Sequence, residues 1–227
     1  MSLAAALPLH RRTAASRIGG RLGAVVAGAG LIAAGGFAAY FINERRQEEA
    51  AHAVVETDGA FSLRRYRPLT VATVTRAGQL SEAMERAFGS LAAYIFAKPG
   101  GRADARSDAR IAMTVPVSAA PLDDKWQVRF GLPADMPRSR LPAPGGDVEI
   151  SEVPGRMVAA VRFAGRSSDR DLVAEKRQAL LDWVESRGLL ALGEPEFAGY
   201  NAPIVPGPLR RNEWWVEVDW AEGPLDN

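Results

Sequence analysis

The chain has 227 residues, of which 47% are hydrophobic and 24% charged, a composition typical of globular proteins. Its net charge of +1 gives no strong positive field, so no nucleic-acid partner is expected. The absence of cysteine excludes disulfides, thiolate nucleophiles and cysteine-based zinc sites. The two histidines are His10 and His52, which excludes a histidine-based triad or a histidine-rich metal site in the rest of the chain.

The N-terminal part of the chain contains a candidate membrane segment. Residues 22–42 carry no charge, and about 20 such residues suffice for a helix across a hydrocarbon core of roughly 30 Å. The segment 1–21 contains four arginines and no acidic residue. This charge bias predicts a basic cytoplasmic start and a domain on the periplasmic or extracytoplasmic side of the inner (cell) membrane. Residues 43–53 are polar and helix-forming, and we expect them to extend the single-pass helix as a stalk.

Two other interpretations of this segment remain open. A cleaved signal peptide would release the domain into the periplasm, but such peptides usually have a shorter apolar core with small residues close behind it. Here Tyr40, Phe41 and Ile42 follow the core. An organellar transit peptide would fit the arginine-rich, acid-free start. We therefore expect an uncleaved transmembrane helix or signal anchor.

An internal repeat sets the expected architecture of the domain. Residues 61–78 align without a gap to residues 148–165, with identities at the positions of Val71, Val74 and Gly78. The repeat predicts two pseudo-symmetric halves, 54–140 and 147–220, followed by a flexible tail, 221–227. A pseudo-symmetric domain tends to bind ligands where its halves meet.

The first half is expected to contain two strands, a helix and two further strands. The strands are expected around Phe61–Tyr66 and Val71–Val74, where apolar residues alternate. Ser81 is the expected N-cap of a helix that ends before Lys98. Residues 111–117 and 126–132 are expected to be strands, separated by a turn at Asp123 and Asp124.

The second half repeats this order. Ser168 is the expected cap of its helix and Gly188 its end, and strands are expected over 197–205 and 213–220. Two helices with about eight strands in antiparallel pairs predict an α+β fold.

Four blocks of the sequence resemble the SOUL/heme-binding protein family. They are FSLRRYRPLTVATV, AFGSLAAYIF, IAMTVPV and the closing block FAGYNAPIVPGPLRRNEWWVEV. The resemblance covers nearly all of residues 54–220 and implies a distorted antiparallel β-barrel of about eight strands with two helices, built from two β-β-α-β-β halves. It also implies binding of heme or another tetrapyrrole in a hydrophobic cleft beside the first helix and the loop before the RRNE motif.

The resemblance implies a set of ligand-contacting residues. They are Met84, Phe88 and Ala92 on one helix face, Met113 in the signature block, and Tyr200, Ile204 and Val205 in the closing block. The same helix stripe also fits an ordinary core-facing surface.

Iron ligation has several candidates in the chain. Heme iron takes histidine, cysteine, methionine or tyrosine, which leaves His52 on the stalk and seven residues of the domain: Met84, Met113, Met136, Met157, Tyr66, Tyr94 and Tyr200. The resemblance implies basic side chains that pair with the heme propionates, but at those positions this chain carries Glu85, Ala93 and Val205. Arg86 and Lys98 are the basic residues that could pair with the propionates instead.

The predicted function is reversible binding of a porphyrin-type molecule for transfer, storage or sensing. No convincing catalytic constellation is present, although Glu85 would be the carboxylate of a hydrolase acting on a small apolar ligand. The alternative is a non-catalytic scaffold that binds a peptide or another apolar ligand. In the motif Arg210–Glu213, we expect Glu213 to pair with an arginine rather than to leave an anion site.

Overall fold

The computed structural model describes residues 48–96, 111, 114–136, 138–202 and 204–220. The expected membrane segment, 22–42, and the expected tail, 221–227, lie outside these residues, as do Met113 and Lys98. Neither helix in the described part of the chain could span a membrane.

The described chain forms two α-helices and ten strands. In order they are β1 (His52–Asp58), β2 (Phe61–Tyr66), β3 (Leu69–Ala77), α2 (Leu80–Phe96), β4 (Val117–Leu122), β5 (Lys125–Gly131), β6 (Glu149–Val153), β7 (Arg156–Phe163), α3 (Arg170–Ser186), β8 (Leu190–Ala191), β9 (Glu196–Gly199) and β10 (Asn212–Asp219). Two 3₁₀ turns, η1 (Arg138–Arg140) and η2 (Gly207–Leu209), lie in the connections.

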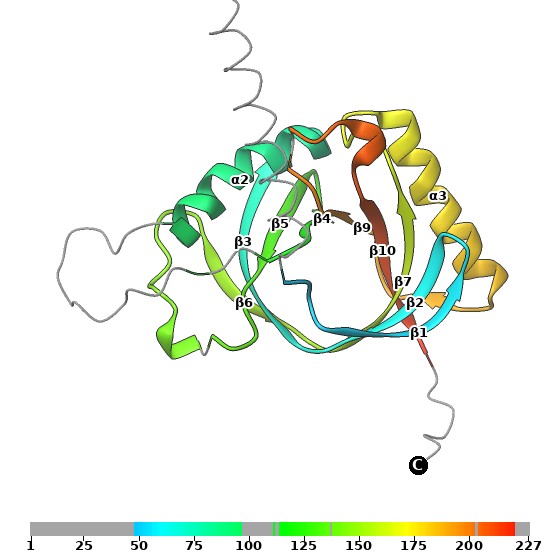
Figure 1. The fold of residues 1–227 in the computed structure, drawn as a ribbon, viewed down its shortest axis with the longest axis horizontal. Helices are drawn as coiled ribbons and strands as arrows, with labels where there is room; N and C mark the ends of the chain where they lie inside the picture. The colour runs from blue at the N-terminus through cyan, green and yellow to red at the C-terminus, as the bar shows by residue number, and fades with distance from the viewer. Residues whose placement is uncertain (1–47, 97–110, 112–113, 137, 203, 221–227) are drawn as a thin grey trace, which may run out of the picture. The chain divides into compact units, whose positions relative to one another are not determined.

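All ten strands belong to one sheet of antiparallel pairs. Its order is β1-β2-β7-β10-β9-β4-β5-β3-β6, with β8 paired to β10 beside this path. The sheet curls but does not close, so the α+β class is confirmed, whereas the expected barrel of about eight strands is corrected to an open ten-stranded sheet (Figure 1). The additional strands are β1, whose side chains are mostly exposed, and the two-residue β8.

The strand order of the sheet is symmetric about its centre. β4 pairs with β9 at the centre, β5 and β10 lie outside them, then β3 and β7, then β6 and β2. Apart from the two-residue β8 after α3, each half has the order β-β-α-β-β, and β2 and β3 correspond to β6 and β7 of the repeat. The second helix has Asp169 as its N-cap, and not Ser168, because the Asp169 side chain accepts from the amide of Leu172.

The two faces of the sheet have different surroundings. Both helices cover the outer face (Figure 1), and the larger apolar core lies there, including Leu91, Phe130, Leu180 and Trp214. Because side chains alternate between faces along a strand, Trp215 lies on the opposite, inner face in a smaller cluster with Tyr66 and Tyr200. Trp214 and Trp215 are therefore both buried, one on each face of the sheet.

An extended segment at the start of the described chain runs beside the residues before β4. Val115 donates its amide to the carbonyl of Glu48 at 2.9 Å, and Ala50 donates to Val115 at 3.4 Å. We call residues 48–51 the strap. The described part of the expected helical stalk is thus extended, and His52 already belongs to β1. Likewise β4 begins at Val117, so the expected strand over 111–117 is wrong.

Candidate functional site on the inner face

The inner face of the curled sheet carries an unusual number of buried polar side chains. Ser62 and Arg64 of β2, Ser118 of β4, Glu196 of β9 and Glu213 of β10 are all buried. Burial of charge is costly unless the charge is paired and hydrogen-bonded. The pairing of these groups therefore determines what this face can bind.

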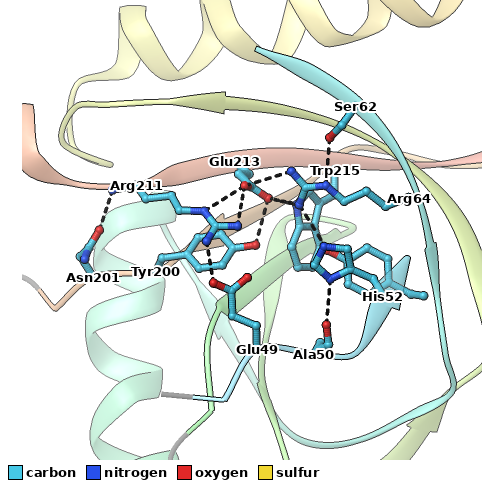
Figure 2. Close-up of polar contacts among 11 residues, drawn as sticks. Glu49, Ala50, His52, Ser62, Arg64, Tyr200, Asn201, Arg211, Glu213 and Trp215 are labelled. Carbon is cyan, nitrogen blue, oxygen red and sulfur yellow. Dashed lines mark hydrogen bonds and ion pairs between the residues drawn. The ribbon is translucent and has the colours of Figure 1, made fainter. Parts of the chain in front are cut away.

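Glu213 is the centre of the first charged group. It is fully buried and accepts from Arg64 Nη1 at 2.7 Å, from Trp215 Nε1 at 2.7 Å and from the Tyr200 hydroxyl at 2.9 Å. Arg211 Nε donates to the other carboxylate oxygen at 3.1 Å. Figure 2 shows these donors converging on one carboxylate from β2, β10 and the end of β9. The expected pairing of Glu213 with an arginine is confirmed, and the carboxylate is saturated with donors.

These contacts fix the charge states of the group. Burial by itself raises the pKa of Glu213, but the hydrogen bond and charge of Arg64, with the charge of Arg211, lower it below the ordinary value. Burial and the negative charge of Glu213 raise the pKa of Tyr200 well above its ordinary value. Glu213 is therefore ionised and Tyr200 is a neutral hydrogen-bond donor at neutral pH.

Arg211 connects this group to the strap. Its guanidinium lies 3.6 Å from the centre of the Tyr200 ring, and its Nη1 is 2.7 Å from Glu49 Oε1. Asn201 accepts from the Arg211 amide at 2.5 Å (Figure 2). The charges of Arg64 and Arg211 are thus balanced by Glu213 and Glu49, and this part of the inner face is an internally neutral structural group.

A second charged group lies around Glu196. Its Oε2 is 2.9 Å from Arg156 Nη2, and its Oε1 is 3.4 Å from Arg129 Nη1. Burial by itself raises the pKa of Glu196, but the charges of Arg156 and Arg129 and a hydrogen bond from Ser118 lower it overall. Glu196 is therefore an ionised carboxylate between two guanidinium groups.

A cavity of about 40 Å³ adjoins this second group. We call it the inner cavity. It is bounded by Arg129, Arg156 and Glu196 on one side and by apolar residues that include Val71, Val153 and Trp215. Its volume holds a few water molecules and is far below the roughly 300 Å³ or more of pockets that enclose drug-sized ligands. A porphyrin ring cannot be enclosed there.

Two of the three predicted contact residues of α2 pack against the outer core. Met84 and Phe88 are partly buried against that core, and Phe88 packs edge-on to Phe130 with ring centroids 5.5 Å apart. Ala92 is half-buried. A Cβ placed on Gly199 would lie 3.4 Å from the terminal methyl of Met84, so α2 is adjacent to the end of β9.

The predicted residues of the closing block are divided among three environments. Tyr200 is on the inner face, bonded to Glu213. Val205 is buried, whereas Ile204 is 68% exposed. Met113 lies outside the described residues. The structure therefore brings Met84 near the start of the closing loop but places the Tyr200 side chain on the other side of the sheet, and ligand contact by these residues stays a prediction.

Most candidate iron donors among the described residues are already engaged. The Tyr94 hydroxyl donates to the Pro142 carbonyl at 3.0 Å. His52 is different, because the bond of its Nδ1 to the Ala50 carbonyl at 2.9 Å leaves Nε2 as a metal donor. Tyr66 accepts from Arg64, and the methionines Met84, Met136 and Met157 pack against the outer core. Apart from His52, the described candidates therefore do not fit heme held by an axial side chain, and a tetrapyrrole held by apolar contact needs no such ligand.

The expected polar partners near α2 are also accounted for. Arg86 donates to the carbonyl of Ala77, which keeps it at the start of the helix. Glu85 is exposed to solvent, where no cleft encloses it among the described pockets. In the part of the chain that the structure describes, no group of three or more histidine, cysteine or acidic residues forms a metal site.

A curled antiparallel sheet with two helices on its outer face, made of two β-β-α-β-β halves, defines the structural class of this protein. The sequence model described as SOUL heme-binding protein matches residues 47–217. The chain belongs to this family, and its membership supports a general role in binding heme or another tetrapyrrole. A comparison with curated proteins found no match.

Solved structures show the same fold at low sequence identity. A hydrolase from Listeria innocua aligns with a TM-score of 0.51 and 12% identity, covering 73% of this chain and 94% of the other. The C-terminal domain of EcmrR aligns with a TM-score of 0.50 and 14% identity, covering 71% and 98%. An uncharacterized conserved protein from Listeria innocua aligns with a TM-score of 0.50 and 12% identity, covering 70% and 92%. At these identities the likeness shows the fold alone.

Proposed function

We propose that this chain is a membrane-anchored SOUL-family protein that binds a tetrapyrrole reversibly for transfer, storage or sensing. The observation that carries the proposal is the family match over residues 47–217, which spans nearly the whole described domain. The uncharged segment 22–42 and the arginines before it support anchoring, with the domain on the extracytoplasmic side.

The proposed ligand surface lies on the outer side of the sheet, between α2 and the loop after β9. Met84 approaches Gly199 there, and Ile204 in the same loop exposes 68% of its surface. Burial of apolar surface at about 25 cal/mol per Å² would provide the affinity, offset by the cost of ordering the ligand. Binding at this surface rests on apolar contact and needs no axial iron ligand.

Titration of the purified 227-residue chain with hemin tests the binding. We expect a shifted Soret band and quenched tryptophan fluorescence at micromolar hemin. Ile204→Asp is expected to weaken binding at least about tenfold, because it places a charge on the proposed apolar surface. Leu190→Asp is the matched control, since Leu190 is 64% exposed on β8. The proposal fails if the unaltered chain gives neither signal.

Fractionation tests the anchoring separately from ligand binding. Membranes washed with alkaline carbonate are expected to retain the chain, and protease added outside spheroplasts is expected to cleave the domain. Recovery of the full chain in the soluble fraction would contradict the anchor, while leaving the hemin titration unaffected.

A further inference from the structure

The inner cavity combines an apolar wall with an excess of positive charge. Three of its lining residues are arginines, Arg67, Arg129 and Arg156, and one is an acid, Glu196. The side chains of Arg129 and Arg156 are about four-fifths buried, at 20% and 19% exposure. The lining is therefore cationic, and water screens these two charges much less than it screens charges on the open surface.

The donors of the two buried arginines are incompletely used by the contacts that hold them. A guanidinium has five N–H donors. Arg156 uses Nη2 for Glu196, and its Nη1 lies 3.8 Å from Glu217, whose side chain is 43% exposed. Arg129 contacts Glu196 at the long distance of 3.4 Å and donates its other terminal nitrogen to Gln127. Arg129 and Arg156 can therefore donate hydrogen bonds to a further anion beside Glu196.

The surrounding wall limits the kind of anion. Val71, Val153 and Trp215 line the same cavity, and these surfaces suit a short hydrocarbon body better than a fully solvated ion. A nearby buried hydroxyl, that of Thr73, has no hydrogen-bond partner among the described residues, and Thr73 lies directly opposite Arg129 in the β3–β5 pair. The volume of about 40 Å³ admits only a small group.

We propose that the inner cavity binds a carboxylate on a short apolar body, with Arg129 and Arg156 holding the carboxylate. Arginine forks match carboxylate geometry and give short charge-assisted hydrogen bonds. Glu196 positions the two guanidinium groups, since it bridges them from β9. The strap borders the cavity, because Ala50 is part of its lining. This site is on the face of the sheet opposite to the proposed tetrapyrrole surface.

Two sources share this chemistry: a free short-chain acid, and a propionate side chain of a larger molecule such as a tetrapyrrole. Propionate is therefore the probe, and propionamide is the neutral molecule of the same shape. Calorimetric titration of the 227-residue chain at constant ionic strength should give at least about tenfold tighter binding of propionate than of propionamide, with a matching rise in Tm by mass action. Equal affinity for the two molecules overturns the proposal.

Variants locate the binding. Arg156→Gln removes one fork and should weaken propionate binding at least about tenfold, whereas Arg162→Gln, an exposed position on the same strand β7, should leave it unchanged. If Arg156→Gln does not fold, Arg156→Lys replaces it in the test, because it keeps the positive charge at this position. Arg156→Lys should still lose affinity, since lysine lacks the fork. Unchanged affinity in Arg156→Lys and Arg156→Gln would also overturn the proposal.

Competition with hemin distinguishes the two sources. Loss of the hemin Soret shift on adding propionate assigns the cavity to a propionate side chain of a tetrapyrrole that lies over the inner face, and then the placement beside α2 is wrong. Simultaneous binding of both assigns the cavity to a free acid. Either result supports a carboxylate site. If hemin does not bind while propionate does, the proposed function fails and the carboxylate site stands.

Discussion

Glu213 shows how one buried residue can organise an entire sheet face. It is inaccessible to solvent, yet it accepts hydrogen bonds from two arginines, a tyrosine and a tryptophan. Such a carboxylate is retained only because its partners compensate for its lost hydration. The arginines in turn need Glu213, because without it their buried positive charges would lack a compensating negative charge.

Replacing this carboxylate by an amide should destabilise the domain strongly. Glu213→Gln leaves the charges of Arg64 and Arg211 incompletely compensated, so we expect a loss of about 3–5 kcal/mol in unfolding free energy. Chemical denaturation of the two proteins measures this loss. Glu217→Gln is the control, since Glu217 is on the same strand but 43% exposed, and should change stability by less than about 1 kcal/mol. Equal effects of the two substitutions would refute the structural role assigned to Glu213.

Sequence reasoning reached Glu213 but not its principal partner. Arg211 is close to it in the chain, whereas Arg64 is on β2 and meets it only through the folded sheet. The pattern offered one signal: Phe61 and Leu63 have the parity of the outer face, while Ser62, Arg64 and Tyr66 share the other. The strand over Phe61–Tyr66 was predicted from its apolar residues alone. That interpretation overlooked that Tyr66 shares a face with Ser62 and Arg64 and not with Phe61. Glu196 gave no comparable signal, because its partners come from β5 and β7.

At the scale of elements, the strap is the feature that periodicity did not predict. Its polar sequence resembled a helical stalk, but its backbone is instead bonded to neighbouring segments: Val115 to Glu48, Ala50 to Val115, and Arg67 to Ala51. Partners distant in the chain thus decided its conformation. In contrast, the repeat predicted the order of the two halves well, because duplicated apolar patterns demand equivalent pairing.

Shortening the chain measures what the strap contributes. A fragment of residues 47–227 should be more stable than one of residues 52–227 by about 2–4 kcal/mol, since three backbone hydrogen bonds are lost and each is worth about 0.5–1.5 kcal/mol. The ion pair of Arg211 with Glu49 adds a smaller amount. Urea titrations of the two fragments provide the comparison. Identical midpoints and slopes would mean that the strap adds nothing.

The start of α3 offers a more local test at the same scale. Asp169 accepts a hydrogen bond from the amide of Leu172 at 3.2 Å, so Asp169→Ala should cost about 1 kcal/mol of stability. Ser168→Ala should cost much less, because Ser168 is not the cap. Thermal unfolding of both variants distinguishes them, and a larger effect at Ser168 would restore the capping assignment made from the sequence.

For the whole molecule, the distribution of charge matters more than its sum. The net charge of +1 conceals an inner face on which ionised glutamates and arginines are buried together. The composition excluded a strong electrostatic field around the protein. It could not reveal the buried ion pairs, because their partners meet only when the sheet curls. The two proposed ligand sites, beside α2 and in the inner cavity, consequently lie on opposite faces of one sheet.

The buried glutamates make the stability of the whole domain depend on pH. The folded-state pKa values of Glu196 and Glu213 are both lowered from the ordinary 4.5, so their contribution is complete above about pH 4.5 and is lost as pH falls through the folded values. We therefore expect unfolding free energy to decrease steadily below about pH 4.5, as measured by urea denaturation at successive pH values. In Glu213→Gln the decrease should be shallower, because one proton-linked group has been removed. Stability that stays constant or rises on acidification would contradict the ionised pairing of both carboxylates.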